Sequence, residues 1–376
     1  MINIFQPDLG DKELEKIKEV FLSNWIGRGE QVKIFEEKFA KNLRSTPIYF
    51  HATTSCTEGL FLSSKLFNFS QDDEIIMPSI SFIACGSSVV DSGAKIVLCD
   101  VDKRTLNATA ETIYQKINKR TKAVILNHYG GYPCDMDPIL KVCRDHGIKI
   151  IEDSACAVKS FYKGKACGTI GDMGIWSFDA MKAIVTGDGG MVYLNDDGLM
   201  RKAKELLYLG LAPKDKSGID KLNAGDDIWW DIEINAPGRR AIMNNVSAAI
   251  GLAQLEKLDR SLKRREQINA LYNEAFSNLE WLKIPPNINE ENTSSFYFYW
   301  VQTKFRDKLA KYLKENGVYS TFRYWPLNRV QYFGLSSKGL DNSEIAADIT
   351  LNIPIHPALS DDDVSKIIDL VRRFKT

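Results

Sequence analysis

Hydrophobic residues recur along the chain with two spacings, one typical of amphipathic helices and one typical of buried strands. Helical spacing predicts two helices near the N-terminus, over 11–23 and 30–43. Short apolar runs then alternate with helical stretches. The runs predicted as strands are 48–52, 74–77, 95–100, 123–127, 148–152, 174–178 and 190–194. The helices predicted beside them are 58–67, a stretch ending near Ser92, 110–118, 136–146 and 202–208.

Continuous apolar strands separated by crossovers are typical of a parallel sheet that is buried on both faces, so the pattern predicts an α/β fold. Residues 210–240 show no regular pattern, and a long helix follows over 244–265. After Pro285 and Pro286 a smaller α/β unit begins, with an aromatic strand over 295–301 and helices over 306–316 and 360–374. We therefore expect a large domain over 1–260 and a small C-terminal domain over 261–376.

Composition narrows the class of protein. The 376 residues are 44% hydrophobic and 26% charged, which is ample for a large core. Lys plus Arg equals Asp plus Glu, 49 against 49, so charge gives no reason to expect nucleic acid or a membrane surface as a partner. No apolar run approaches the roughly 18 residues that span a bilayer, and the N-terminus has no pattern of a signal peptide.

The seven cysteines all lie in the first half of the chain. Their number is odd, and they form neither a CxxC pair nor a metal-ligating cluster with histidines. We interpret them as reduced, mostly buried thiols, which predicts a cytoplasmic protein without a metal centre.

Lys182 stands in a glycine-rich turn between the predicted strands 174–178 and 190–194. An isolated lysine in a loop is usually solvated. A lysine whose neighbours disfavour the ammonium form can instead lose its proton and attack a carbonyl.

Polar residues at the carboxyl ends of other strands support a binding or catalytic site near Lys182, because ligands of parallel sheets bind at that edge. Asp153 follows a buried strand, and the turn 53–57, with Cys56 and Thr57, opens a helix where free N–H groups can bind an anion. Phe82 follows a third strand. Each has an ordinary alternative, an N-cap for the polar residues and core packing for Phe82. Together they describe a site for pyridoxal phosphate, with a lysine for the aldehyde, a carboxylate for the pyridinium, a helix start for the phosphate and an aromatic over the ring.

A second candidate feature is the loop 24–29 between the first two helices, which carries Trp25 and Arg28 among glycines. It is either a plain helix connection or a loop that contacts substrate, and the sequence favours neither.

Over nearly its whole length the chain resembles the DegT/DnrJ/EryC1/StrS family of sugar aminotransferases. The stretch 177–190, which reads Ser177-Phe-Asp-Ala-Met-Lys182 and ends in Gly187-Asp-Gly-Gly190, is the most specific, together with Ile151-Glu-Asp-Ser-Ala155 upstream. Other matching stretches are 73–82, 93–102, 135–138, 162–165, 168–172 and 248–258.

The resemblance implies an aspartate-aminotransferase-like, fold-type I enzyme that works as a homodimer with active sites shared between subunits. Lys182 would be the Schiff-base lysine and the acid/base, and Asp153 would pair with the pyridinium nitrogen. The phosphate would be bound by Ser177 with Cys56 and Thr57, and Phe82 would lie over the ring.

Three positions depart from the family pattern. Cys156 stands where a Gln or His usually contacts the phenolic oxygen of the cofactor, and a thiol is a weak hydrogen-bond partner. Arg240 aligns with the Asn or Lys that reaches the phosphate from the neighbouring subunit, and Arg239 is the alternative. Asp188 replaces a usual Glu.

The function implied is transfer of an amino group, from an amino acid such as L-glutamate, to a nucleotide-linked keto sugar. Transamination of a small phosphorylated ketone is an alternative, and a pyridoxal-phosphate-binding regulatory protein without catalysis is another. The related sugar dehydratases carry histidine in place of this lysine, so Lys182 argues against dehydration. For the substrate we name Trp25, Arg28, Arg323 and Tyr324 as candidate contacts, on loops that vary most within families.

Overall fold

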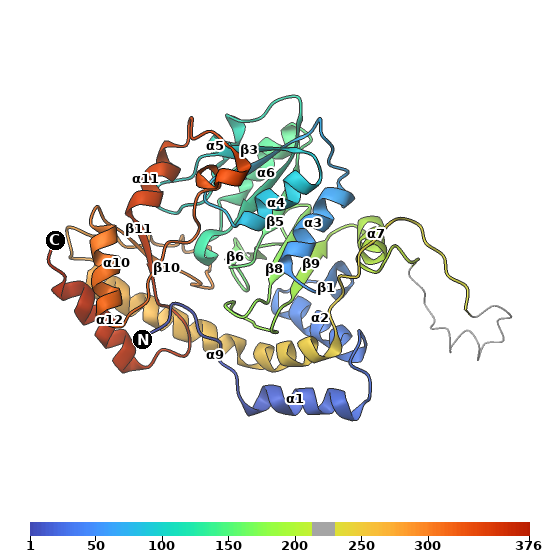
Figure 1. Ribbon diagram of the computed structural model, residues 1–376, viewed down its shortest axis with the longest axis horizontal. Helices are drawn as coiled ribbons and strands as arrows, with labels where there is room; N and C mark the ends of the chain where they lie inside the picture. The colour runs from blue at the N-terminus through green and yellow to red at the C-terminus, as the bar shows by residue number, and fades with distance from the viewer. Residues whose placement is uncertain (213–229) are drawn as a thin grey trace.

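A computed structural model of the chain describes residues 1–212 and 230–376. Its centre is a seven-stranded sheet in the order β1-β9-β8-β5-β4-β2-β3 (Figure 1). Neighbouring strands are parallel, except where β9 pairs with β1 and β8. The predicted α/β fold with a mainly parallel sheet is confirmed. The strands of this sheet are β1 (Phe50–Thr53), β2 (Glu74–Pro78), β3 (Lys95–Cys99), β4 (Thr121–Asn127), β5 (Lys149–Asp153), β8 (Met173–Ser177) and β9 (Gly190–Leu194).

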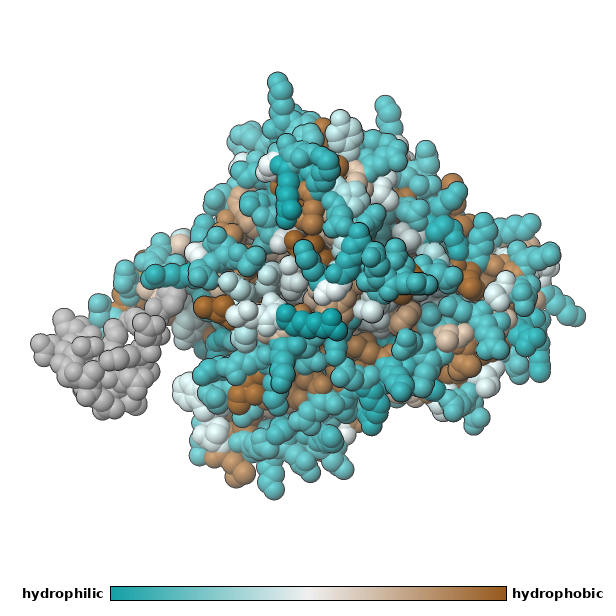
Figure 2. Space-filling model, turned by 180° about the vertical axis from the view of Figure 1, so that it is seen from behind, coloured by the Kyte–Doolittle hydropathy of each residue, from teal (hydrophilic) through white to brown (hydrophobic). Residues whose placement is uncertain are grey.

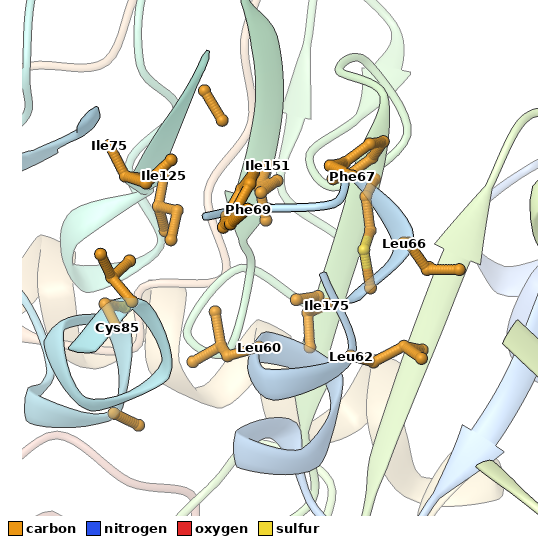
Figure 3. Packing of buried hydrophobic residues seen from close by; sticks show 14 of the residues in the cluster. Leu60, Leu62, Leu66, Phe67, Phe69, Ile75, Cys85, Ile125, Ile151 and Ile175 are labelled. Carbon is orange, nitrogen blue, oxygen red and sulfur yellow. The ribbon is translucent and has the colours of Figure 1, made fainter. Parts of the chain in front are cut away.

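One face of the sheet is covered by α3 (Cys56–Leu66), α4 (Ile83–Asp91) and α7 (Asp197–Leu207). Figure 3 shows side chains of α3 meeting those of the strands in this layer. The strand residues that point to this face alternate along each strand with those that point away, as the two-residue period of a strand requires. Those facing this layer of helices include Ile75, Ile125, Ile151 and Ile175.

The other face is covered by two groups of helices. The strand residues that alternate with Ile75, Ile125 and Ile151 point to this face. They include Ile76, Val124 and Ile150, which pack with α5 (Ala110–Tyr114) and α6 (Met136–Asp145). Trp176 and Phe178 pack with α2 (Glu30–Asn42) and the first half of α9 (Asn245–Phe276). The sheet is therefore the middle of three layers, which buries it on both sides.

The long helix α9 joins the sheet to a smaller C-terminal unit. Along its first half it packs against α1 (Asp11–Leu22) and α2, and its second half enters a separate core (Figure 1). That core contains the antiparallel pair β10 (Tyr299–Gln302) and β11 (Thr350–Ile353), covered by α10 (Arg306–Glu315) and α12 (Asp361–Arg373). Because α9 runs through residue 260, the boundary between 1–260 and 261–376 falls within a helix, and the division stays a prediction.

The remaining elements are short or lie at the edges. Within residues 1–212 and 230–376 they are α11 (Asp341–Ile349), the hairpin of β6 (Phe161–Tyr162) with β7 (Lys165–Ala166), and four 3₁₀ turns, η1 (Pro47–Tyr49), η2 (Tyr129–Gly131), η3 (Leu327–Arg329) and η4 (Gln331–Phe333).

Two predicted strands begin at least two residues later than expected. Residues 47–49 form the turn η1, with Pro47 at its start, so β1 begins only at Phe50. In the aromatic stretch 295–301, Phe296 has a φ of 47°, which takes the backbone out of the strand conformation. The two residues after it, Tyr297 and Phe298, donate their N–H groups to the carbonyl of Gly130 instead of to a strand, and β10 begins at Tyr299.

The surface seen from behind is mainly hydrophilic, with hydrophobic residues scattered between (Figure 2). Large apolar side chains are exposed at the end of α1 and in the loop after it, namely Phe21, Leu22, Trp25 and Ile26. Within residues 1–212 and 230–376, none of the helices combines the length and the apolar character needed to cross a bilayer.

Candidate active site

A cavity of about 250 Å³ lies where the carboxyl ends of β4, β5 and β8 meet the start of α3. Residues from the C-terminal unit complete its wall. The predicted site residues that line it are Cys56, Thr57, Phe82, Asp153, Cys156, Ser177, Lys182, Asp188, Arg323 and Tyr324. The structure therefore brings to one place a set of residues that is spread along the sequence from position 56 to position 324.

Asp153 is the last residue of β5 and is buried. Its Oδ1 accepts a hydrogen bond from the backbone N–H of Ala155 at 3.0 Å, which fixes the carboxylate. The thiol of Cys85 lies 3.4 Å from Oδ2, and the thiol of Cys56 lies 4.0 Å from Oδ1. Burial and the nearby carboxylate raise the pKa of both thiols well above the ordinary value. Both cysteines are therefore neutral neighbours of Asp153.

Lys182 lies in the loop after β8, where its backbone N–H donates to the carbonyl of Asp179 at 2.9 Å. Its Nζ lies 3.7 Å from the Sγ of Cys156 and 4.9 Å from the ring centre of Tyr297. Burial acts to lower the pKa of Lys182, but Cys156, the tyrosines 297 and 324, and Asp153 outweigh it and raise the pKa well above its usual value. The sequence left open that neighbours might disfavour the ammonium form; burial acts in that direction here, and the surrounding acidic groups act against it.

The start of α3 forms a cradle of backbone N–H groups beside Ser177. The first N–H groups of a helix have no partner within the helix, and the positive end of its dipole attracts anions. Gly190 pairs with Thr53 on one side and Ser177 on the other, which draws these three positions together. A Cβ at Gly190 would come within 2.5 Å of the carbonyl carbon of Ser55 and 2.6 Å of the nitrogen of Cys56. Only glycine allows this close approach.

Phe82 and Tyr324 are in edge-on contact in the wall of the cavity. Their ring centres are 5.5 Å apart, at an interplanar angle of 60°, and Phe82 keeps 39% of its surface exposed. The Tyr324 hydroxyl lies 3.3 Å from the Sγ of Cys156. The guanidinium of Arg323 lies 5.5 Å from the ring centre of Phe5, which also lines the cavity.

Three predicted contacts do not line this cavity within one chain. Trp25 is 61% exposed and donates its Nε1–H to the carbonyl of Arg28. Arg28 pairs with Glu36 at 2.8 Å. Arg240 is exposed and lies over the ring of Tyr208, and its alternative Arg239 pairs with Glu58 at 3.0 Å. A role for Arg240 in the site of a second subunit stays a prediction.

The family model that matches the chain covers residues 7–372. The chain belongs to the DegT/DnrJ/EryC1/StrS aminotransferase family. The resemblance inferred from the motifs is confirmed, and the protein is an aminotransferase of fold type I.

Several sugar aminotransferases are similar to this chain over nearly the full length of both proteins. The dTDP-4-dehydro-2,3,6-trideoxy-D-glucose 4-aminotransferase of Saccharopolyspora spinosa is 43% identical, over 98% of this chain and 95% of that protein. A GDP-perosamine synthase of Vibrio cholerae is 31% identical, over 100% of this chain and 99% of that protein. The crystal structure of the aminotransferase TlmJ from Streptoalloteichus hindustanus has a TM-score of 0.93 at 45% identity, over 99% of this chain and 98% of that one. Sugar aminotransferases are thus its relatives.

The cavity of this aminotransferase fits pyridoxal phosphate. Asp153 can face a ring nitrogen, the cradle of α3 with Ser177 can bind a phosphate, and Lys182 can reach an aldehyde. In addition, Oδ1 of Asn127 is buried and has no hydrogen-bond partner within the described part of the chain. Such an orphaned polar atom in a cavity wall is typical of a position that a ligand completes.

The sequence interpretation missed several residues of the wall. Asn127 could have been found, because it ends strand β4 and pairs in register with Asp153 on β5. The aromatic pattern predicts Tyr297 and Phe298 in a strand, and nothing local indicates that they bond to Gly130, which follows β4. Phe5 lines the wall but carries no local signal of a site, and neither does Cys85, whose thiol contacts Asp153 without lining the cavity.

Proposed function

We propose that this aminotransferase uses pyridoxal phosphate to take an amino group from an amino acid, L-glutamate, and passes it to a keto sugar carried on a nucleotide. The observation that supports this most is the meeting of Lys182, Asp153 and the α3 cradle around one cavity. Each of the three matches a different part of the cofactor, and they come from separate segments of the chain.

Each of these residues would contact a different part of the cofactor. When bound, the cofactor supplies an electron-withdrawing ring that stabilises negative charge on the substrate carbon. Asp153 would present a carboxylate to the ring nitrogen and so would favour its protonated form. Ser177, Thr57 and the N–H groups at the start of α3 bind the phosphate. Phe82 covers one face of the ring. Lys182 would hold the aldehyde of the cofactor through Nζ and would be the group that takes and returns the proton at the substrate carbon.

For the acceptor we propose a deoxysugar with a ketone at carbon 4. The relative with 43% identity is named for the amination of carbon 4 of a dTDP-linked sugar, and it covers nearly this whole chain. Arg323 supplies a positive charge on the cavity wall that suits a carboxylate or phosphate of a substrate.

We further propose a homodimer in which each subunit completes the site of its partner, in the reducing environment of the cytoplasm. Phe21, Leu22, Trp25 and Ile26 form exposed apolar surface of the kind that subunits bury. Arg28 and Arg240 would then have their roles in the partner's cavity. All seven cysteines are free thiols, as expected in a reducing compartment.

Absorption spectroscopy of the protein loaded with pyridoxal phosphate tests the first half of the proposal. We expect a visible band of the bound cofactor that bleaches when L-glutamate is added. The amino-loaded protein is then offered dTDP-, UDP- and GDP-linked 4-keto and 3-keto deoxysugars and small phosphorylated ketones. Return of the band with one nucleotide-linked sugar supports the proposal. Return only with a phosphorylated ketone would replace the acceptor, and a band that responds to no amino donor would favour a regulatory protein.

A further inference from the structure

The contact between Cys156 and Tyr324 bears on how this site holds its cofactor. Cys156 stands where the family pattern has a larger side chain, Gln or His, that contacts the phenolic oxygen of the cofactor. Its Sγ lies 3.7 Å from Nζ of Lys182 and 3.3 Å from the Tyr324 hydroxyl. A thiol donates weakly, whereas a phenol is a good donor. Apart from Lys182 itself, the strong donor that contacts Cys156 is the Tyr324 hydroxyl.

Packing holds the Tyr324 ring in place from two sides. Its ring centre is 5.5 Å from that of Phe82 and 5.8 Å from that of Phe298. Cys156 is also fixed, because its carbonyl accepts a hydrogen bond from the Ser295 hydroxyl at 2.6 Å. Burial raises the pKa of Tyr324 well above its usual value, so the phenol keeps the proton that a donor needs.

The structure of pyridoxal phosphate places its phenolic oxygen on the ring carbon beside the one that bears the aldehyde, with the ring nitrogen opposite the aldehyde. A ring whose nitrogen faces Asp153 and whose aldehyde carbon meets Nζ of Lys182 has its phenolic oxygen next to Nζ. The residues that the structure places near Nζ include Cys156, Tyr297 and Tyr324.

Tyr297 is a poor candidate for this donor. Its hydroxyl donates to the carbonyl of Met181 at 3.2 Å, and it presents the face of its ring to Lys182. Asn127 is a second rival, since its Nδ2 donates to the Ile80 carbonyl at 3.4 Å while Oδ1 is buried without a partner in the described chain. An amide in that orientation offers an acceptor, which does not suit a phenolate. Within the described part of the chain, the Tyr324 hydroxyl is hydrogen-bonded only to the thiol of Cys156. This is a weak bond that a ligand can replace.

We propose that Tyr324 is a cofactor-positioning residue whose hydroxyl donates to the phenolic oxygen of bound pyridoxal phosphate, in place of the side chain that Cys156 replaces. The inference rests on the proposed function, because it requires the cofactor to bind as described above. It reassigns Tyr324 from the substrate to the cofactor and explains how a small residue is tolerated at position 156.

The test is a pH titration of the absorption of the bound cofactor, which needs no turnover. A donor to the phenolic oxygen stabilises its deprotonated form and so lowers the midpoint of the titration. Tyr324→Phe keeps the ring packing and removes only the hydroxyl, and we expect the midpoint to rise by about one to two pH units, the effect of one hydrogen bond to a charged group. Adding Cys156→Gln to Tyr324→Phe restores a donor and should return the midpoint toward that of the parent protein.

Two further variants keep the interpretation specific. Tyr297→Phe removes a buried hydroxyl that is already bonded to Met181, and its midpoint should stay within about 0.3 units of the parent, which supports the inference. An equal rise in Tyr297→Phe and Tyr324→Phe would overturn it, as would a rise in Asn127→Ala with none in Tyr324→Phe. A failure of Cys156→Gln to reverse the shift would also overturn it. If the parent protein shows no cofactor band at all, the proposed function itself fails.

Discussion

Nε2 of His128 lies 2.9 Å from Oε2 of Glu152, and both side chains are fully buried. The same carboxylate accepts backbone hydrogen bonds from Gly168, Ile170 and Gly171 at 2.6 to 2.8 Å. Glu152 therefore ties β5 to the turn that leads into β8. Asp153, the next residue, points into the cavity instead, so two adjacent carboxylates serve different purposes.

Glu152→Gln should destabilise the fold, whereas Asp153→Asn should not. The glutamine places an NH₂ group against backbone donors in a buried site, and we expect a loss of about 2–4 kcal/mol in the free energy of unfolding. In Asp153→Asn the amide oxygen can still accept from Ala155, so the cost should stay below about 1 kcal/mol, while affinity for pyridoxal phosphate and turnover fall. Urea unfolding and cofactor titration measure the two effects. Equal loss of stability in both variants would contradict the assignment.

Lys182→Ala should abolish turnover without preventing the binding of pyridoxamine phosphate. Pyridoxamine phosphate already carries its amino group, so its binding depends on Asp153, Ser177 and the start of α3 and not on a bond to lysine. The loss in kcat should reach at least the roughly 10²–10⁴-fold that a positioned acid/base contributes. Single-turnover assays and calorimetric titration with pyridoxamine phosphate check both halves. Full activity of the variant would remove Lys182 from its role.

Gly190→Ala tests the cradle at the start of α3. The added Cβ would come within 2.5 Å of the Ser55 carbonyl carbon, so the helix start must shift away from Ser177. We expect the Kd for pyridoxal phosphate to rise at least about tenfold, a change on the order of 1.4 kcal/mol.

Gly10→Ala is the matched control for this substitution, because a Cβ at Gly10 meets nothing within 4 Å. Its affinity for pyridoxal phosphate should equal that of the parent protein. Unchanged affinity in Gly190→Ala would show that the phosphate is bound elsewhere.

The sequence predicts the part of this site that strands and motifs carry. Asp153 follows a buried strand, Cys56 and Thr57 open a helix after another, and Lys182 lies in a glycine-rich turn, so each is visible from its own neighbours. The structure brings all four to one cavity, and their individual roles stay predictions.

The rest of the wall depends on contacts between distant segments. Tyr297 and Phe298 reach the cavity because their N–H groups bond to Gly130, which lies far earlier in the chain, and no local pattern encodes that pairing. Trp25 and Arg28 show the converse. Their loop is recognisable from its glycines. Its position on the molecule, however, is set by the hydrogen bond of Trp25 with Asn245 of α9 and by the ion pair of Arg28 with Glu36.

His356 makes the stability of the C-terminal unit depend on pH. Its side chain is buried, Nε2 donates to the carbonyl of Asn3, and Nδ1 has no partner within residues 1–212 and 230–376. Burial lowers the pKa of His356 from its usual 6.5 to about 4, and Arg265 adds to the effect. The folded state therefore excludes a proton that the unfolded chain binds below about pH 6.5. Stability is full above that pH and falls as the pH drops to about 4, by at most about 3 kcal/mol.

His356→Gln should flatten this dependence, because glutamine can still donate to Asn3 but does not titrate. We expect the variant to be less stable than the parent at about pH 7 and to lose less stability between about pH 6.5 and 4.5, as measured by urea unfolding at each pH. His146→Gln, at an exposed position at the end of α6, should keep the slope of the parent protein. A slope that persists in His356→Gln would mean that another buried group, such as His51, whose pKa burial also lowers well below its usual value, carries the acid sensitivity.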